Sequence, residues 1–448
     1  MAWISSDCLA RGTAGCRVSV RAAAWLLLAA GLTPAGATNP VHADESPAPM
    51  WGDVLLATPE GAILPRSLRG NREITSAFIP PDAGGRAMGD ARGALMNFDG
   101  VVLIAIVTLA DHREEAYHVP RTTGDDIDIY NEQVILGGTV VALQPLTQTV
   151  LTTAPILGVR RLLLQARPSE ARVRDEAMHA ASAFAHVAQQ RGETIGTRSR
   201  QAAIRRRTFG APLLDAGRSD GVQPGLQIPA VDRDTATGVL CAVRRVNEHD
   251  SELECSGPPS DHAVGRYLRS DGRDVAKYQV LSAAITSPKA QAVLAQSLAA
   301  DEVMVAFAAS DQLAARGCTV LPPGGQEGLA VLERAILEFE AAHGVADSLL
   351  KTFSLGLSPD HQVTVLVDGY NTAVVHGAGV KRRRIHKAWA TVTDDHGHGG
   401  QGIGVAVVDE IEDWQEEAPQ TADAREAIIN AVKCATGRLV GEESKECE

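Results

Sequence analysis

Gln362-Val-Thr-Val-Leu-Val367, Ala388-Trp-Ala-Thr-Val-Thr393 and Ile403-Gly-Val-Ala-Val-Val408 are the stretches that decide the fold class of this chain. Each is short and rich in branched side chains, which is typical of β-strands. A helical pattern follows them over Ala422–Thr436 and ends near Gly437. Consecutive strands followed by a helix, with further helices and strands before them, predict an α+β domain for residues 275–448.

The earlier part of this domain shows two more helical and two more strand patterns. Pro288–Ala299 and Glu327–His343 are predicted helices, and Gly344 ends the second. Asp301–Phe307 and Cys318–Leu321 are predicted strands. Helices and strands therefore alternate before the three consecutive strands.

Three further regions precede this domain. Residues 169–207 are predicted to form a helix, capped by Ser169 and stopped at Gly192, and then a basic linker. Residues 208–272 are predicted to form a small β module. Residues 51–166 are predicted to be a mostly β region with strands at Trp51–Ala57, Val101–Val107, Gln133–Leu136, Val140–Leu143 and Thr149–Thr152. The expected fold is α+β and multidomain, with a mostly β N-terminal region, a β-barrel-like module and a C-terminal α+β domain.

Composition excludes some functions. The chain has 448 residues, 45% of them hydrophobic, so it can bury a core. Its formal net charge of −13 argues against nucleic-acid binding. Only 4% of the residues are aromatic, which argues against a groove that binds single-stranded nucleic acid or carbohydrate by stacking on aromatic rings.

The first 43 residues have the pattern of an export signal. Arg11, Arg17 and Arg21 precede an apolar run, Ala22–Leu32, and small residues follow it at Ala35-Gly-Ala37 and Val41-His-Ala43. Cleavage is expected after Ala37 or Ala43, and the alternative is a single membrane anchor. No transmembrane segment is expected in the mature chain. In a bacterial host this pattern predicts a periplasmic or secreted protein.

The positions of the cysteines are compatible with disulfide formation in an oxidising compartment. Cys241 and Cys255 flank a predicted hairpin whose loop is Asn247-Glu-His-Asp250. A three- or five-residue loop would place the two cysteines opposite each other, whereas a four-residue loop would put them on opposite faces. A disulfide and two separate buried thiols therefore remain alternatives. Cys434 and Cys447 are a second candidate pair.

A basic stripe lies inside this acidic protein. Residues 160–207 contain eleven arginines against four acidic residues, and the stripe ends in Arg205, Arg206 and Arg207. Such a cluster predicts contact with an anionic surface, such as lipid headgroups, or with an acidic envelope protein. A solvated helix face followed by a loop is the alternative.

A candidate metal site lies in Asp394-Asp-His-Gly-His398, with His386 nearby in the sequence. A carboxylate with two imidazoles suits zinc, so Asp394, His396 and His398 are candidate ligands, and zinc is the one cofactor considered. A flexible hairpin tip is the alternative. The segment His112–His118 also has ligand spacing, but the preceding strand and Pro120 argue against the helix that it would need.

Two catalytic patterns fail on their context. Gly217-Arg-Ser-Asp-Gly221 matches a nucleophile elbow, but Pro224 and Gly225 prevent the helix that should follow Ser219. Gly397-His-Gly-Gly-Gln-Gly402 matches a dinucleotide-binding loop, but it leads into a strand instead of a helix. Neither pattern is expected to carry chemistry.

Residues 213–257 resemble a known kind of module. They read D-x-G-x-x-D-G-V-x-x-G followed by T-G-V-L-x-x-V-x-x-V, which is similar to the small β-barrels of exported scaffold proteins of the MreC kind and of the FlgT C-terminal barrel. Gly317–Pro323 is also similar to the strand that opens envelope α/β domains of the TolB N-terminal or CsgG type. These resemblances imply an envelope assembly or scaffold role without catalysis.

We therefore expect an exported, non-enzymatic protein of the cell envelope with a binding, scaffold or assembly role. The alternative is a secreted metal-dependent hydrolase that uses His396 and His398. A secreted effector or toxin also remains open.

Overall fold

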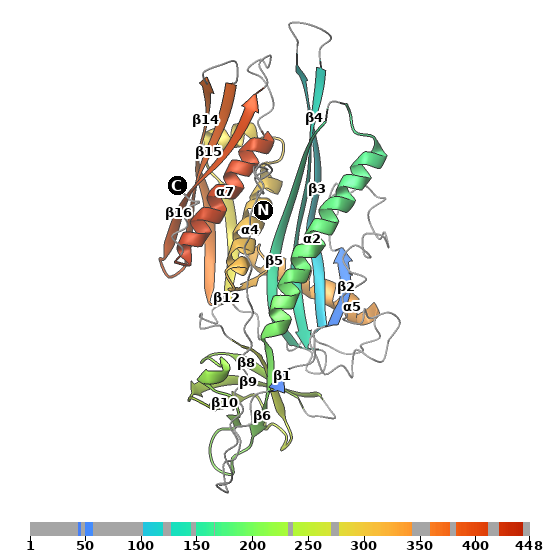
Figure 1. Cartoon of the computed structure of the whole chain (residues 1–448). Coiled ribbons are helices and arrows are strands. Elements are labelled where there is room, and N and C mark those ends of the chain that lie inside the picture. The colour runs from blue at the N-terminus through green and yellow to red at the C-terminus, as the bar shows by residue number, and fades with distance from the viewer. Residues whose placement is uncertain are drawn as a thin grey trace, which may run out of the picture. The chain divides into compact units, whose positions relative to one another are not determined.

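The computed structural model describes residues 44–45, 50–56, 102–119, 127–144, 149–164, 166–231, 236–269, 277–342, 359–376, 382–410 and 421–441. The predicted export signal, residues 1–43, lies outside these ranges. The described residues form three sheets and several helices (Figure 1), so the α+β prediction is confirmed.

The first sheet has the order β2-β3-β4-β5. Three of its strands form an antiparallel meander, and the fourth, β2, pairs in parallel with β3. Their bounds are Met50–Leu56 (β2), Val102–Val119 (β3), Ile127–Gln144 (β4) and Thr149–Leu164 (β5). The two strands predicted at 133–136 and 140–143 are one strand, β4, which runs straight through Gly137 and Gly138.

Helix α2, Glu170–Arg198, packs on this sheet against β4 and β5. Its Phe184 is buried over Gly138, where an added Cβ would lie 2.9 Å from the Phe184 ring. The glycine thus makes room for the aromatic side chain. The predicted stop at Gly192 is wrong, because the helix continues through that buried glycine to Arg198.

The second sheet has the order β13-β12-β14-β15-β16. Its first three strands are parallel, and β14, β15 and β16 are antiparallel, as their succession in the sequence predicts. Their bounds are Lys277–Ile285 (β12), Thr319–Leu321 (β13), His361–His376 (β14), Arg382–Asp394 (β15) and Gly399–Glu410 (β16). The three consecutive strands predicted at 362–367, 388–393 and 403–408 lie within β14, β15 and β16, which are longer.

The described residues of this half of the chain include the helices α3 (Pro288–Val293), α4 (Leu298–Ala315), α5 (Gly325–Ala342) and α7 (Thr421–Leu439). The predicted strand Asp301–Phe307 is wrong, since these residues lie in α4. This helix packs against β5 of the first sheet and against β12 and α7 of the second. It is buried on nearly all sides and therefore lacks the one-sided apolar pattern of a surface helix.

The third sheet is a small barrel. Its order is β1-β6-β11-β8-β9-β10-β7, and an additional β6–β7 pairing closes it. The bounds are Asp44–Glu45 (β1), Ser199–Arg205 (β6), Leu213–Leu214 (β7), Gln227–Val231 (β8), Ala236–Val246 (β9), Ser251–Cys255 (β10) and Val264–Leu268 (β11). The predicted barrel-like module is confirmed, but the basic linker expected before it is instead the end of α2 followed by the barrel strand β6.

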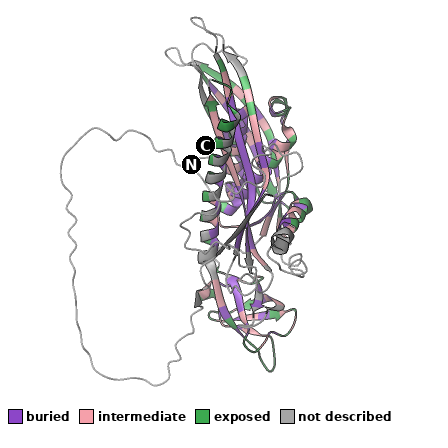
Figure 2. Cartoon of the chain, turned by 90° about the vertical axis from the view of Figure 1, so that its right-hand side faces the viewer, coloured by how far each residue is buried: buried purple, intermediate pink, exposed green. Residues whose placement is uncertain are grey.

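The buried side chains form two main clusters. One is the barrel's own core, which includes Ile204, Ile228 and Tyr267. The other runs continuously from the first sheet through α4 to the second sheet and α7. The two regions expected as separate domains at 51–166 and 275–448 therefore share one core, and Figure 2 shows buried residues along their strands.

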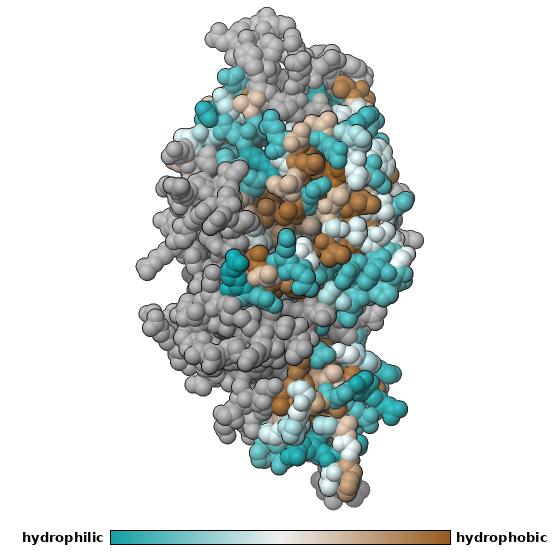
Figure 3. Space-filling view, turned by 180° about the vertical axis from the view of Figure 1, so that it is seen from behind, coloured by the Kyte–Doolittle hydropathy of each residue, from teal (hydrophilic) through white to brown (hydrophobic). Residues whose placement is uncertain are grey.

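On one face of β14 and β16, apolar side chains are exposed in the part of the chain that the structure describes. Val365, Val367 and Ala406 point toward the core, whereas Leu366, Ile403, Val405 and Val407 are exposed. Figure 3 shows apolar side chains on the side of the molecule opposite to that of Figure 1. Among the helices that the structure describes, none has the length and hydropathy needed to cross a membrane.

Candidate metal centre

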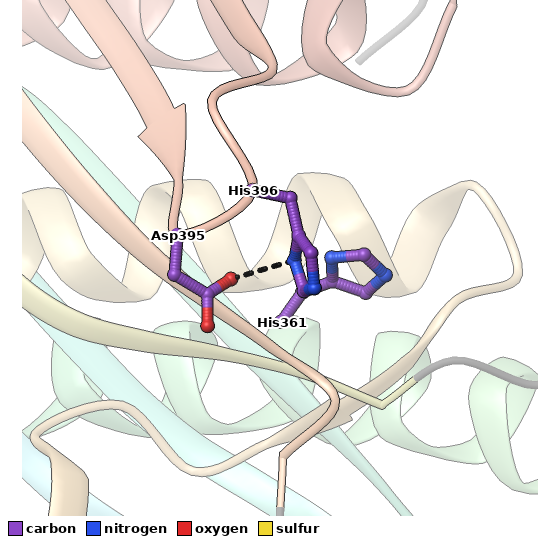
Figure 4. A group of neighbouring side chains, drawn as sticks. All are labelled: His361, Asp395 and His396. Carbon is purple, nitrogen blue, oxygen red and sulfur yellow. Dashed lines mark ion pairs between the residues drawn. The ribbon is translucent and has the colours of Figure 1, made fainter.

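Three potential metal ligands meet at one end of the second sheet (Figure 4): His361, Asp395 and His396. His361 begins β14, and the other two lie in the turn between β15 and β16. The backbone brings them together, because Asp395 N donates to Gln362 O over 3.0 Å and Gln362 N donates to the Asp395 carboxylate over 3.1 Å. The turn is thus bound to the first residues of β14.

The donor atoms of this cluster lie within 4.8 Å of one another. His396 Nδ1 is 3.0 Å from Asp395 Oδ1, and the His361 and His396 rings meet edge to face with centroids 4.6 Å apart. On its other side His361 stacks on Tyr278 of β12, with centroids 4.8 Å apart. This stacking orients the His361 ring toward the turn.

The Nδ1 atom of His361 is buried and has no hydrogen bond to any described residue, although it lies 3.3 Å from Asp394 Oδ2. A buried imidazole nitrogen without a hydrogen bond costs free energy, so a bound cation there would offset that cost. We therefore treat His361, Asp395 and His396 as the site.

Asp394 organises the turn instead of joining this cluster. Its Oδ1 accepts hydrogen bonds from the backbone nitrogens of His396 (3.1 Å) and His398 (2.7 Å), and its Oδ2 lies 2.9 Å from His398 Nδ1. The predicted ligand set of Asp394, His396 and His398 is thus brought together only in part. His396 is in the cluster, whereas Asp394 and His398 form a neighbouring pair.

Both carboxyl groups are held in the charged form. Burial alone would raise the pKa of Asp394, but hydrogen bonds from the His398 ring and backbone and from the His396 backbone lower it below its usual range. The hydrogen bond from the Gln362 backbone lowers the pKa of Asp395. A carboxylate must be deprotonated to bind a metal ion, and an aspartate is already charged near neutral pH, so the lowered pKa values extend its readiness to bind toward acidic pH.

Two imidazoles and one carboxylate form a donor set that suits zinc and similar divalent transition metals. A tetrahedral ion with bonds of about 2.1 Å separates its ligand atoms by about 3.4 Å, so small side-chain rotations would suffice. Three protein ligands leave a fourth position for water, for a ligand, or for the neighbouring Asp394–His398 pair.

The other histidines that the sequence singled out lie elsewhere. His386 is fully buried, with Nδ1 2.6 Å from Tyr370 Oη and Nε2 3.9 Å from Asp423. Burial lowers its pKa to about 4, although Asp423 opposes this effect. His112 is in strand β3, not in a helix, and lies 3.0 Å from Glu132. Neither residue joins the cluster.

Arg205, Arg206 and Arg207 lie at the end of β6 and just after it, and all three are exposed. Arg205 pairs with Asp215 over 2.6 Å, and Arg206 pairs with Asp261 over 3.2 Å. Part of the predicted basic cluster is therefore balanced within the barrel.

Cys241 and Cys255 form a disulfide. The hairpin loop has four residues, because Val246 pairs with Ser251, and this register would have placed the cysteines on opposite faces. A β-bulge between Glu252 and Leu253 skips Arg244 and shifts the register, so that Cys255 pairs with Cys241. Cys434 is also disulfide-bonded, while Cys447 lies outside the described residues.

The two rejected motifs have structural roles. Ser219 lies in a short 3₁₀ turn, Arg218–Asp220, where its hydroxyl donates to Glu248 O over 2.7 Å and lies 3.2 Å from His249 Nδ1. No helix follows it, so the nucleophile elbow is absent from this described part of the chain. Two glycines of the second motif, Gly400 and Gly402, lie in β16 and face α7.

Sequence reasoning missed a buried ionic network between the two large sheets. The Arg425 side chain of α7 donates to Asp301 (2.8 Å), Gln133 (2.6 Å) and Ser297 (2.9 Å). Arg113 of β3 also donates to Asp301 over 2.7 Å. Asp301 is fully buried, and so is almost all of Arg425. Through these hydrogen bonds the network joins β3, β4, α4 and α7.

Comparison with known proteins adds little to these observations. No protein-family model matches the chain, and no curated protein sequence matches it. A solved structure of a neuraminyllactose-binding hemagglutinin homolog from Helicobacter pylori is similar over 36% of this chain and 91% of that one, with 12% identity. Its TM-score is 0.22, so it supports no conclusion about fold or function.

Proposed function

We propose that this chain is an exported, non-enzymatic binding protein of the bacterial cell envelope that holds a divalent transition-metal ion at His361, Asp395 and His396. The observation that carries the metal role is the convergence of three potential ligand atoms, one each from His361, Asp395 and His396, within 4.8 Å of one another. Zinc is the ion that this donor set fits best.

Two observations support export. The N-terminal residues have the secretory pattern, and a disulfide joins Cys241 and Cys255. Expression of the full chain in a bacterial host, followed by fractionation and N-terminal sequencing, tests this part. A mature chain that starts after Ala37 or Ala43 supports it, whereas an uncleaved chain in the cytosol with reduced thiols contradicts it.

The barrel supports a scaffold or assembly role, because small exported barrels of the MreC and FlgT kind present binding surfaces without catalysis. The partner would be another envelope protein or an anionic surface, and Arg205, Arg206 and Arg207 would contact it. Cross-linking in the native envelope tests the protein partner.

Metal binding is tested by titrating zinc into the purified, metal-free protein without an affinity tag. We expect one ion per chain, and at least about tenfold weaker binding in His361→Ala and in His396→Ala, because each removes a ligand. His262→Ala is the matched control, since His262 is an exposed histidine of the barrel. Equal affinity in all four proteins would contradict the site.

A metal-dependent hydrolase is the second candidate, and the three-ligand set favours it because the remaining position could hold a reactive water. Its ligands would be His361 and His396, whereas the sequence had indicated His396 and His398. Hydrolysis of an activated ester or phosphate by the zinc-loaded protein, lost in His361→Ala, would support this alternative. Binding of zinc without such turnover favours the non-enzymatic role.

A further inference from the structure

A basic loop of the barrel carries a strongly exposed aromatic ring. Phe209 is 92% exposed, far more than any other large apolar side chain in the described part of the chain, among which the next is Val407 at 55%. It lies two residues after Arg207 in the loop that follows β6, and Arg205 is the last residue of that strand. Gly210 comes next with a φ of 109°, which lets the chain turn immediately behind the ring.

The barrel holds the base of this loop in place. Arg205 and Arg206 form ion pairs with Asp215 and Asp261, which belong to other segments of the same barrel. Their side chains remain 66% and 51% exposed, so these pairs contribute little stability and leave the guanidinium groups accessible. Arg207 forms no ion pair with any residue that the structure describes.

We propose that this loop, Arg205–Gly210, docks the barrel on an anionic phospholipid surface, with the Phe209 ring inserted at the level of the headgroups. This extends the proposed envelope location and does not depend on the metal centre. Arginine donates paired hydrogen bonds to phosphate, and aromatic rings favour the membrane–water interface. Each basic side chain near an anionic membrane adds to the electrostatic attraction.

The size of the loop favours a lipid surface over a folded protein partner. A stable protein interface takes about 800 Å² from each partner. A single aromatic side chain supplies about 150–250 Å², and its neighbours in the loop are charged or small. A membrane requires no complementary pocket, so one ring and a few cations can give weak, reversible binding.

The test is sedimentation of the purified mature protein with phosphatidylglycerol–phosphatidylcholine vesicles and, in parallel, with pure phosphatidylcholine vesicles. We expect binding to the anionic vesicles alone, with weaker binding at high salt. Phe209→Ala should lower the partition coefficient about tenfold, since it removes the ring that would be inserted into the membrane. Arg207→Ala should lower it about fivefold, since it removes one cation.

Matched variants distinguish vesicle binding through this loop from nonspecific binding by other exposed basic or apolar side chains. Arg245→Ala removes an exposed arginine from β9, and Val407→Ala removes exposed apolar surface from β16, so both should bind as the wild type does. His361→Ala should also bind normally, which separates this inference from the metal centre. Circular dichroism confirms that each variant is folded.

Either of two results overturns the inference. The first is no binding of the wild type to anionic vesicles, including the case in which this loop cross-links to an envelope protein. The second is vesicle binding that Phe209→Ala and Arg207→Ala leave unchanged.

Discussion

Gly402 of β16 lies directly against Ala431 of α7. A Cβ built on Gly402 would be 2.3 Å from the Ala431 carbonyl oxygen, and the same close approach recurs where Gly404 meets Ala427 and Gly400 meets Ala435. The glycines at every second position of β16 therefore face every fourth residue of α7. Gly400 and Gly402, two of the glycines that resembled a dinucleotide-binding loop, are instead required for close packing of α7 on β16.

Substitution of Gly402 by alanine should destabilise the protein by about 1–3 kcal/mol, because the added methyl group has to displace helix backbone. Gly399→Ala is the matched control, since its Cβ would meet neighbours at an ordinary 3.5 Å. Urea unfolding measures both. Equal midpoints for the two variants would show that α7 can move away from β16 without cost.

Loss of the Arg425 charge should be more costly. Arg425→Met leaves Asp301 buried with only Arg113 to balance it, so we expect a loss of about 3–5 kcal/mol. Arg438→Met in the same helix removes an exposed side chain that donates to Gln401 O, and it should cost less than about 1 kcal/mol. Thermal unfolding compares them, and similar losses would contradict the importance of the buried network.

His386 should make the stability depend on pH. Its pKa is about 4 in the folded protein and about 6.5 when unfolded, so between these values the unfolded chain binds the extra proton. Stability should therefore fall as the pH drops from about 6.5 to about 4, by about 3 kcal/mol in total. Asp423, Arg384, Arg161 and Tyr370 are the titratable or charged groups around it.

His386→Gln should flatten the pH profile of the free energy of unfolding within that window, whereas the exposed control His262→Gln should not. Urea unfolding at several pH values measures this difference. A slope that survives in His386→Gln would assign the pH dependence to other groups.

Reduction of the barrel disulfide should destabilise the barrel by about 3 kcal/mol, as expected for a cross-link that closes a short loop. The double variant Cys241→Ala/Cys255→Ala should unfold at the same urea concentration with and without dithiothreitol when a barrel probe is followed. Cys318→Ala should keep the dependence on reductant, because Cys318 takes no part in the Cys241–Cys255 bond. No effect of reductant on the wild type would contradict a stabilising bond.

Prediction from the sequence succeeded where a side-chain pattern faces one environment. In β14, β15 and β16 one face lies toward the core and the other is open, so the alternation of apolar and polar residues could be recognised. Helix α7 was also recognised, although it continues through the predicted stop at Gly437 to Leu439. The prediction failed at Asp301–Phe307, because α4 lies between two sheets and is buried on almost every side. A helix without a polar side has no period of 3.6 to detect.

The sequence by itself determined the α+β class, the barrel-like module, the basic loop and a turn rich in histidine and aspartate, since each depends on residues close together in the chain. Only the tertiary structure decided which groups meet. A bulge brought Cys255 opposite Cys241, and the register of β14 against β12 and β15 brought His361 to Tyr278 and His396. Strand register and layer packing depend on contacts between distant segments, which a local pattern does not encode.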